Sequence, residues 1–249
     1  MLISVIIPTL NEEASLPVTL RQLGDHPDVE LIVVDGGSRD RTVSIAQQFT
    51  PYVFVSEPGR ARQMNVGARH ATGDILLFLH ADSFLLPGAL YEIQRRIIGD
   101  GAVGGAFDLQ VDSGRQLFLI ATHLANRRTR WFGLPYGGQG IFVWRQVFGA
   151  LGGFPEIPIM EDIAFARRLR GAGRLTFVHT GLVASGRCWN ANGVLRTLFV
   201  NWWVTMLFFL RVPPRQLRRI YDGWMTSGRQ SQGRSDLTPP GRKRLQKQI

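Results

Sequence analysis

Short apolar runs alternate with amphipathic stretches along the first half of the chain. The apolar runs have the length and the β-branched content of strands, and the stretches between them carry apolar residues at helical spacing. Strands are expected at residues 2–9, 29–37, 52–57 and 74–82, and helices at residues 12–24, 41–49 and 60–71. This alternation predicts an α/β fold with a mostly parallel central sheet covered by helices.

Beyond residue 82 the pattern is less regular. Residues 86–97 predict a helix, and residues 103–112 predict a strand that joins the sheet. A helix-like stretch at 117–131 leads into the glycine-rich segment 131–140, which is expected to be a mobile or substrate-facing loop. The rest of this region predicts a strand, two helices and a strand, carried by residues 141–154, 160–173 and 175–183.

The most apolar segment of the chain covers residues 194–210. Arg196 and Arg211 enclose fourteen residues without a formal charge, whereas a membrane-spanning helix needs about 20 apolar residues. As a helix, the segment has a narrow polar stripe formed by Thr197, Asn201 and Thr205. Its tryptophans suit a membrane interface, and an equally good interpretation is a helix that packs in the core or in a dimer.

Length and composition indicate one globular domain with an appendage. At 249 residues and 45% hydrophobic content, the chain is able to bury a sizeable core. We expect an α/β domain over residues 1–190, an apolar helical extension over residues 191–225 and a basic, disordered tail over residues 226–249.

Cysteine content and the N-terminal sequence point to a reducing compartment. Cys188 is the single cysteine of the sequence, which excludes an intramolecular disulfide and disfavours a cysteine-based zinc site. The apolar N-terminal run has neither the basic segment nor the cleavage site of a secretory signal, so it is expected to form the first strand. We therefore expect a cytoplasmic protein.

The net charge of +10 is concentrated near the C-terminus. Ten Lys or Arg and two Asp lie between residues 211 and 249, which leaves a net charge of +2 for residues 1–210. A basic tail of this kind contacts anionic lipid head groups or solvent. Nucleic acid is not an expected partner, because no aromatic residues alternate with the basic ones from Arg229 onward. Peripheral contact with the inner face of the cell membrane, through residues 194–211, is part of this expectation.

Four carboxylates follow segments that the expected sheet would bring together: Asp35, Asp82, Glu161 and Asp162. Taken singly, each is explained by a turn, a cap or a favourable charge at a helix N-terminus. Their joint placement predicts a shared site at the carboxyl ends of the strands, where open α/β sheets bind ligands.

Four motifs then give the chain a specific resemblance to a known family. They are SVIIPTLNEEASLPVTL, LIVVDGGSRDRT, GRARQMNVGARHATGDILLFLHADS and LGGFPEIPIMEDIAFARRLR. In this order they cover residues 2 to about 170, and they resemble the family 2 glycosyltransferases. The fold of that family is GT-A, a Rossmann-like fold of nucleotide-diphospho-sugar transferases. The chain also resembles a small bacterial subgroup with HAD, here His80, Ala81 and Asp82, where most members have the metal-binding DXD.

The resemblance implies that the chain binds a nucleotide diphosphate sugar, with a UDP-sugar as the default. In the family, residues after the first strand and the aspartate after the second strand hold the base and the ribose. The matching residues here are Pro8, Thr9, Asn11, Glu12 and Asp35. Arg60 and Arg62 are expected to contact the diphosphate, because guanidinium groups pair with phosphate oxygens, although a solvated helix face explains either arginine equally well.

The HAD motif implies a divalent cation at the diphosphate. Asp82 matches the metal-binding carboxylate of the family, and His80 either binds the metal or forms a hydrogen bond near it, with Ala81 beside the nucleotide sugar. Such a cation would neutralise the charge of the leaving diphosphate. Mn2+ is expected ahead of Mg2+, since imidazole suits manganese better.

The ED pair implies the catalytic base. Asp162 matches the general base of the family, which takes the proton of the acceptor hydroxyl in an inverting transfer, and Glu161 either orients the acceptor or supports the base. Processive members carry QXXRW after this pair, and the sequence lacks it, so transfer of one sugar is expected. The acceptor is expected to be a hydroxyl, carried by a lipid or another amphipathic molecule if the apolar helix lies beside the site. Arg187 and Trp189 would line the acceptor side or the diphosphate side of the site.

Other classes of α/β enzyme have no support in the motifs. The sequence contains neither the GXGXXG of dehydrogenases nor the GXXXXGK of P-loop enzymes, and its first loop is acidic where a nucleotidyltransferase needs basic residues. Two alternatives stay open. One is a homodimer, and the other is a catalytically degenerate GT-A fold that serves as a membrane-surface binding module.

Overall fold

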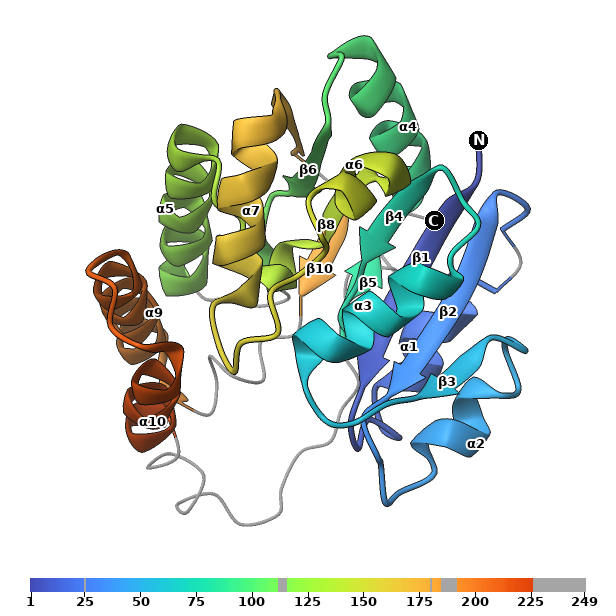
Figure 1. Ribbon diagram of the computed structural model, residues 1–249, viewed down its shortest axis with the longest axis horizontal. Coiled ribbons are helices and arrows are strands. Elements are labelled where there is room, and N and C mark those ends of the chain that lie inside the picture. Colours follow the sequence, from blue (N-terminus) through green and yellow to red (C-terminus); the bar gives the residue numbers. More distant parts are fainter. Residues whose placement is uncertain (25, 112–115, 180, 185–191, 226–249) are drawn as a thin grey trace.

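A seven-stranded sheet with helices on both faces forms the centre of the molecule (Figure 1). The computed structural model describes residues 1–24, 26–111, 116–179, 181–184 and 192–225. Most neighbouring strands of the central sheet run parallel, so the expected α/β class is confirmed.

The elements have the following bounds. The central sheet contains β1 (Ile3–Thr9), β2 (Val29–Asp35), β3 (Val53–Val55), β4 (Ile75–Phe78), β6 (Gly104–Phe107), β8 (Ile141–Trp144) and β9 (Leu175–Val178). A second, three-stranded sheet contains β5 (Phe84–Leu85), β7 (Gln110–Val111) and β10 (Leu182–Ala184). The helices are α1 (Leu16–Arg21), α2 (Thr42–Ala46), α3 (Arg60–His70), α4 (Ala89–Gly99), α5 (Gln116–Phe132), α6 (Arg145–Ala150), α7 (Glu161–Ala172), α9 (Val194–Phe209), α10 (Pro214–Met225) and the 3-10 turn η1 (Gly137–Gln139).

The first strand, β1, lies in the parallel part of the central sheet, whose order is β3-β2-β1-β4-β8-β6-β9. It pairs in parallel with β2 and β4, whereas β8 runs antiparallel to β4 and β6. Val5 faces a core shared with α1, α2 and α4, and Ile6 faces a core shared with α3, α6 and α7. Burial on both faces explains the continuous apolar run. At the carboxyl end of the strand, Thr9 is in register with Asp35 of β2.

Two segments that the sequence predicts as single strands divide between the two sheets. Residues 103–112 form β6 and β7, and residues 175–183 form β9 and β10. The chain leaves the central sheet at Asp108, which is buried and binds Arg130 of α5 and His179. These partners are distant in the sequence, so the pattern within either segment does not reveal the break.

The helices α9 and α10 form a hairpin beside α5, away from the central sheet (Figure 1). Val200 and Val204 pack against Met160 and Ile163 at the start of α7, so one side of α9 belongs to a core. None of the described helices is both long and apolar enough to cross a membrane.

Several expectations fall outside the described residues. These are the environment of Cys188, the place of Arg187 and Trp189, and the disorder of residues 226–249. They stay predictions, as do the expected domain boundaries.

Close packing of α3 on the sheet leads to a prediction about stability. A Cβ atom at Gly67 would clash with Ile6 Cγ2 and would lie 3.2 Å from Val34 Cγ2. We expect Gly67→Ala to lower the free energy of unfolding by about 1–3 kcal/mol, because overpacking forces the helix and the sheet apart. Gly171→Ala in α7 is the control, since a Cβ there meets no atom within 4 Å. Equal urea midpoints for the two variants would contradict the packing argument.

Candidate active site

The first group of expected site residues surrounds the carboxylate of Asp35 at the end of β2. This side chain is buried. Its Oδ2 accepts hydrogen bonds from the backbone N–H groups of Gly37 at 2.8 Å and Ser38 at 2.7 Å, and its Oδ1 accepts from the hydroxyls of Ser38 and Thr9. Because both oxygens are occupied, Asp35 shapes the turn that follows β2.

Hydrogen bonds join the loop after β1 to the loop after β2. Asn11, at φ +53°, donates its backbone N–H to Ser38 Oγ at 2.8 Å and accepts at Oδ1 from the N–H of Arg39 at 2.9 Å. The backbone N–H of Glu12 donates to Thr42 Oγ1 at 2.8 Å. Residues of the two loops that are expected to hold the nucleotide therefore lie side by side.

Gln63 of α3 fixes the ends of the same two strands. Its Nε2 donates to the carbonyl of Thr9 at 2.8 Å and to the carbonyl of Val34 at 2.9 Å. Pro8 lies at this end of β1 and is half-buried. Nothing in the sequence marks Gln63 for this role, because a glutamine is ordinary on an amphipathic helix.

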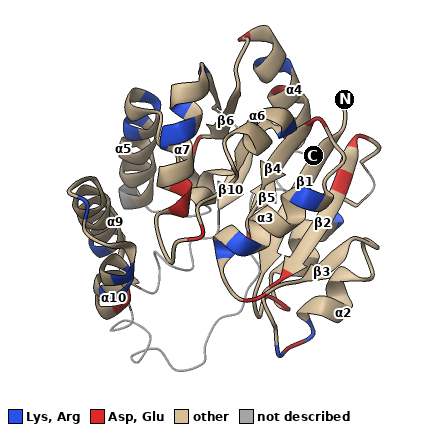
Figure 2. Cartoon of the chain, viewed as in Figure 1, with Lys and Arg blue, Asp and Glu red and all other residues tan. Residues whose placement is uncertain are grey.

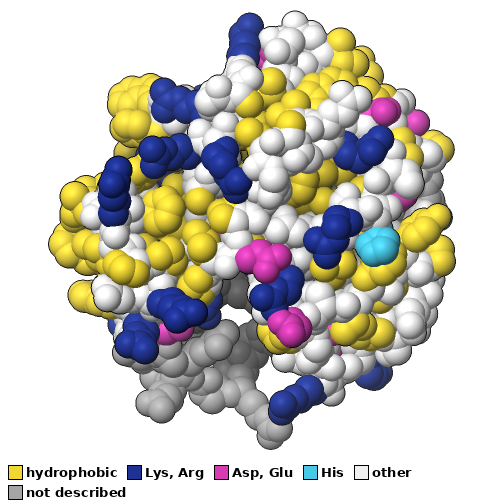
Figure 3. All heavy atoms as spheres, in the orientation of Figure 1, with side chains coloured by type: hydrophobic (Ala, Val, Ile, Leu, Met, Phe, Trp, Pro, Cys, Tyr) yellow, Lys and Arg dark blue, Asp and Glu magenta, His cyan; other side chains and the backbone are white. Residues whose placement is uncertain are grey.

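The second group of expected residues surrounds Arg60, the first residue of α3. Its guanidinium forms an ion pair with Glu161, lies 3.9 Å from Asp162 Oδ2 and lies 3.5 Å from His80 Nε2. The basic start of α3 thus faces the acidic start of α7 (Figure 2). Figure 3 shows acidic and basic side chains together in the middle of this face. Burial alone would lower the pKa of Arg60, but the carboxylates of Glu161 and Asp162 raise it.

Two backbone amides hold Asp162. The N–H of Gly137 donates to Oδ2 at 2.6 Å, and the N–H of Ile163 donates to Oδ1 at 2.7 Å. Burial and the charge of Glu161 raise the pKa of Asp162, while Arg60 and the two amides oppose the rise. A buried carboxylate with a raised pKa is a stronger base than an exposed aspartate.

Three side chains that line the cavity converge at Gly137. A Cβ atom at Gly137 would lie 3.3 Å from His80 Nε2, 3.4 Å from Asp162 Oδ2 and 3.7 Å from Arg60 Cζ. A methyl group at this position would therefore crowd the imidazole and the carboxylate, and glycine avoids this contact. The expected substrate-facing segment 131–140 contributes this glycine through η1.

His80 and Asp82 line the same cavity and offer an imidazole nitrogen and a carboxylate. Burial and the positive charge of Arg60 lower the pKa of His80 to about 4, so the ring is neutral near pH 7. Among the described residues, no group of three His, Cys, Asp or Glu side chains is placed to hold a metal. An imidazole nitrogen and a carboxylate are both ligand types of divalent cations, which also accept phosphate oxygens and water as ligands.

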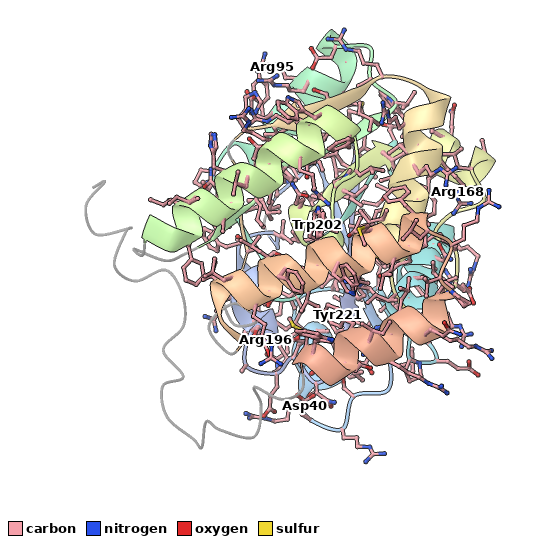
Figure 4. All side chains as sticks on the ribbon, turned by 90° about the vertical axis from the view of Figure 1, so that its left-hand side faces the viewer. Asp40, Arg95, Arg168, Arg196, Trp202 and Tyr221 are labelled. Carbon is pink, nitrogen blue, oxygen red and sulfur yellow. The ribbon has the colours of Figure 1, made fainter. Side chains whose placement is uncertain are left out.

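The cavity has a volume of about 870 Å³ and extends well beyond these residues. Its far end lies between α5, α9 and α10, with walls formed by Leu124, Trp202 and Tyr221. Figure 4 shows Trp202 and Tyr221 on α9 and α10. No sequence motif indicates these wall residues, because they come from three helices that are distant in the sequence.

Arg62 and Ala81 lie apart from this cluster. Arg62 forms surface ion pairs with Glu57 and, at 3.2 Å, with Glu156. Ala81 is buried, and its carbonyl accepts a hydrogen bond from Thr19 Oγ1 at 2.8 Å. In this structure neither side chain lines the cavity.

Comparison with known proteins identifies relatives of the chain. The family model described as "Glycosyl transferase family 2" matches residues 4–148. A PGL/p-HBAD biosynthesis glycosyltransferase of Mycobacterium bovis is 43% identical over 91 residues, which cover 33% of this chain and 36% of the relative. The match therefore spans about a third of the length of this curated relative.

Two solved structures share the fold. S. aureus TarS 1-349 in complex with UDP-GlcNAc has a TM-score of 0.58 and 19% identity, with 90% of this chain and 71% of that chain covered. The mannosyltransferase PcManGT from Pyrobaculum calidifontis, in complex with GDP-Man and Mn2+, has a TM-score of 0.61 and 17% identity, with 93% and 76% covered. At this level of identity the likeness establishes the fold alone.

The ion cluster leads to a prediction about pH-dependent stability. Arg60→Met leaves the carboxylates of Glu161 and Asp162 buried without the positive charge of the guanidinium. The Arg60 side chain is 40% exposed, so solvent screening reduces the usual cost of a broken buried pair, and we expect a loss of about 1–3 kcal/mol at pH 7.

The loss should grow with pH. The pKa of Asp162 is already raised above its unfolded value by burial and by Glu161, and removal of Arg60 raises it further. A group with a raised folded pKa stabilises the fold below its unfolded pKa, and this stability is lost as the pH rises through the folded pKa. Urea unfolding from about pH 4 upward should show it, with Arg62→Met as the control. A loss that is the same at every pH, or equal in the two variants, would contradict the assignment.

Proposed function

The chain belongs to glycosyl transferase family 2, and we propose that it transfers one sugar from a nucleotide diphosphate sugar to an acceptor hydroxyl, with inversion and with a divalent cation. The observation that carries this proposal is the environment of Asp162. Two backbone amides orient this buried carboxylate, and it lines the same cavity as His80 and Arg60. A candidate base, an arginine suited to phosphate oxygens and an imidazole nitrogen therefore border one cavity.

Asp162 is the proposed general base. It removes the proton of the acceptor hydroxyl while that oxygen bonds to the anomeric carbon, and the bond from this carbon to the diphosphate breaks on the opposite side. Each carboxylate oxygen has two acceptor positions. Oδ2 is therefore able to accept from the acceptor hydroxyl while it keeps the N–H of Gly137.

Arg60 is the proposed diphosphate contact, and Glu161 is its positioning residue. The ion pair with Glu161 holds the guanidinium beside the cavity, where His80 is 3.5 Å away. Guanidinium groups pair with phosphate oxygens through two parallel hydrogen bonds. Because Glu161 engages Arg60, we assign it to the support of the site and not to contact with the acceptor.

Asp82 and His80 would hold the cation. When bound, such an ion neutralises charge on the leaving diphosphate. A neutral imidazole suits Mn2+ better than Mg2+, and the structurally similar mannosyltransferase from Pyrobaculum calidifontis was solved with Mn2+. We therefore propose Mn2+ ahead of Mg2+.

The nucleotide is proposed to bind at the joined loops after β1 and β2. Thr9, Asn11, Glu12 and Asp35 lie there, and Pro8 borders them at the end of β1. Among the structural neighbours, S. aureus TarS was solved with UDP-GlcNAc and the mannosyltransferase with GDP-Man. We keep a UDP-sugar as the proposed donor.

The proposed acceptor is the hydroxyl of a lipid or another amphipathic molecule, and the protein is proposed to be cytoplasmic with peripheral membrane contact through residues 194–211. Support comes from the cavity, which leads from Asp162 to apolar side chains of α5 and α9. Transfer of a single sugar follows from the missing QXXRW motif.

Nucleotide titration tests the donor side of the proposal. In calorimetry with UDP, GDP and their sugars, we expect one nucleotide to bind more tightly with Mn2+ present. Asp82→Asn should weaken this binding by about tenfold or more, since it removes a metal-binding carboxylate. Asp28→Asn changes an exposed aspartate and serves as the control. If no nucleotide binds, the degenerate binding module becomes the better interpretation.

Replacement of the base tests the chemical step. Asp162→Asn should lower kcat by about 10²–10⁴-fold, the usual contribution of a general base, while nucleotide affinity stays unchanged. Glu161→Gln is the neighbouring control and should lower kcat less, because the base itself remains. An equal loss of nucleotide affinity and turnover in Asp162→Asn would assign the residue to donor binding instead.

A further inference from the structure

The outer face of α5 and α9 exposes large apolar side chains that no described part of the chain covers. Examples with exposed fractions of 50–70% are Ile120, Leu124, Trp131, Leu195, Phe199 and Trp202. The two helices lie side by side and pack through Phe118, Ala121, Val194 and Leu198. Their exposed side chains therefore form one surface, which we call the α5–α9 face and which lies on the side of the molecule seen in Figure 4.

The polar stripe of α9 points inward, next to the buried Val200 and Val204. Thr205 Oγ1 lies 2.8 Å from the hydroxyl of Tyr136, and Asn201 lines the cavity. Phe199 and Trp202 are exposed by 50% and 57%, although Phe199 also contacts Trp224 of α10 and Trp202 lines the cavity. A helix that packs its polar side on its own domain normally meets an apolar environment on the other side.

The charge of this region is predominantly positive. The segment Gln116–Phe132 contains three arginines and no Asp or Glu, and residues 194–225 contain five arginines and one carboxylate, Asp222. Two of these arginines are paired, Arg130 with Asp108 and Arg218 with Asp222. Two copies of such a surface would bring like charges together across an isologous contact. An anionic lipid surface offers the opposite charge and accepts apolar side chains at the same time.

The cavity of the proposed reaction opens on this face. Leu124 and Trp202 are each 57% exposed, and both also line the cavity that reaches Asp162. The mouth of the cavity is thus bordered by the side chains of the α5–α9 face.

We infer that the α5–α9 face docks on an anionic lipid bilayer, with the mouth of the reaction cavity held against the lipid. The bilayer then supplies an amphipathic acceptor directly to the cavity, a consequence that rests on the proposed function. The docking surface is formed by α5 and α9 together, and tryptophans occupy it as they do at membrane interfaces.

Vesicle binding by the full chain tests the inference. Sedimentation with vesicles of phosphatidylglycerol and phosphatidylcholine should retain the protein, and pure phosphatidylcholine should retain less of it. Ile120→Glu/Leu195→Glu should weaken binding by about tenfold or more, because it removes apolar contacts and adds negative charge. The matched control is Tyr91→Glu/Ile98→Glu on α4, which changes residues of similar exposure and should leave binding unchanged.

A second measurement does not depend on whether the double glutamate variants fold. Brominated lipids quench tryptophans in contact with a bilayer, so they should quench the unmodified protein, and Trp202→Phe should reduce this quenching. Absence of vesicle binding and of quenching would overturn the inference, as would equal effects of the two charge pairs. A dimer that Ile120→Glu/Leu195→Glu dissociates, without vesicle binding, would make the face an interface between copies.

Nucleotide titration of the same samples separates the two proposals. Nucleotide binding without vesicle binding overturns docking and leaves the proposed transferase standing. Vesicle binding without nucleotide binding would support docking and would overturn the proposed donor site.

Discussion

The site depends on one arrangement of charges: two buried carboxylates and a single guanidinium. Glu161 and Asp162 begin α7 on one side of the cavity, and Arg60 begins α3 on the other. Two buried like charges side by side are costly without a cation, so the ion pair fixes the distance between the two helices. Gln63, one turn after Arg60, ties the same helix to the ends of β1 and β2. One helix therefore contacts both the strand ends beside the proposed nucleotide loops and the proposed base, Asp162.

Much of the fold follows from the sequence where neighbouring residues determine it. The strands near residues 3–9 and 29–35 can be predicted from the sequence, because a strand that is buried on both faces has a continuous apolar run. The break after β6 cannot be predicted in this way, since Asp108 at the break forms ion pairs with Arg130 and His179, which lie elsewhere in the sequence. The local pattern of apolar and polar residues does not indicate such tertiary ion pairs.

The same distinction separates the parts of the site. Asp35, Asp82 and Asp162 stand out in the sequence because each follows a strand or begins a helix within a motif. In the sequence, Gly137 stands out only as part of a glycine-rich loop, and its hydrogen bond to Asp162 is known only from the fold. For α9 the sequence leaves a core helix and an interfacial helix open. In the structure Val200 packs inward, so one side of α9 belongs to a core, while residues such as Phe199 are exposed.

In the proposed reaction, donor binding and base strength are coupled through Arg60. Its guanidinium now lies beside Glu161, Asp162 and His80, and its charge opposes the rise in the pKa of Asp162. When phosphate oxygens compete for this guanidinium, less of its charge is available to Asp162. In the proposed reaction this competition would favour a higher pKa for Asp162, whereas the positive charge of the bound cation would oppose it.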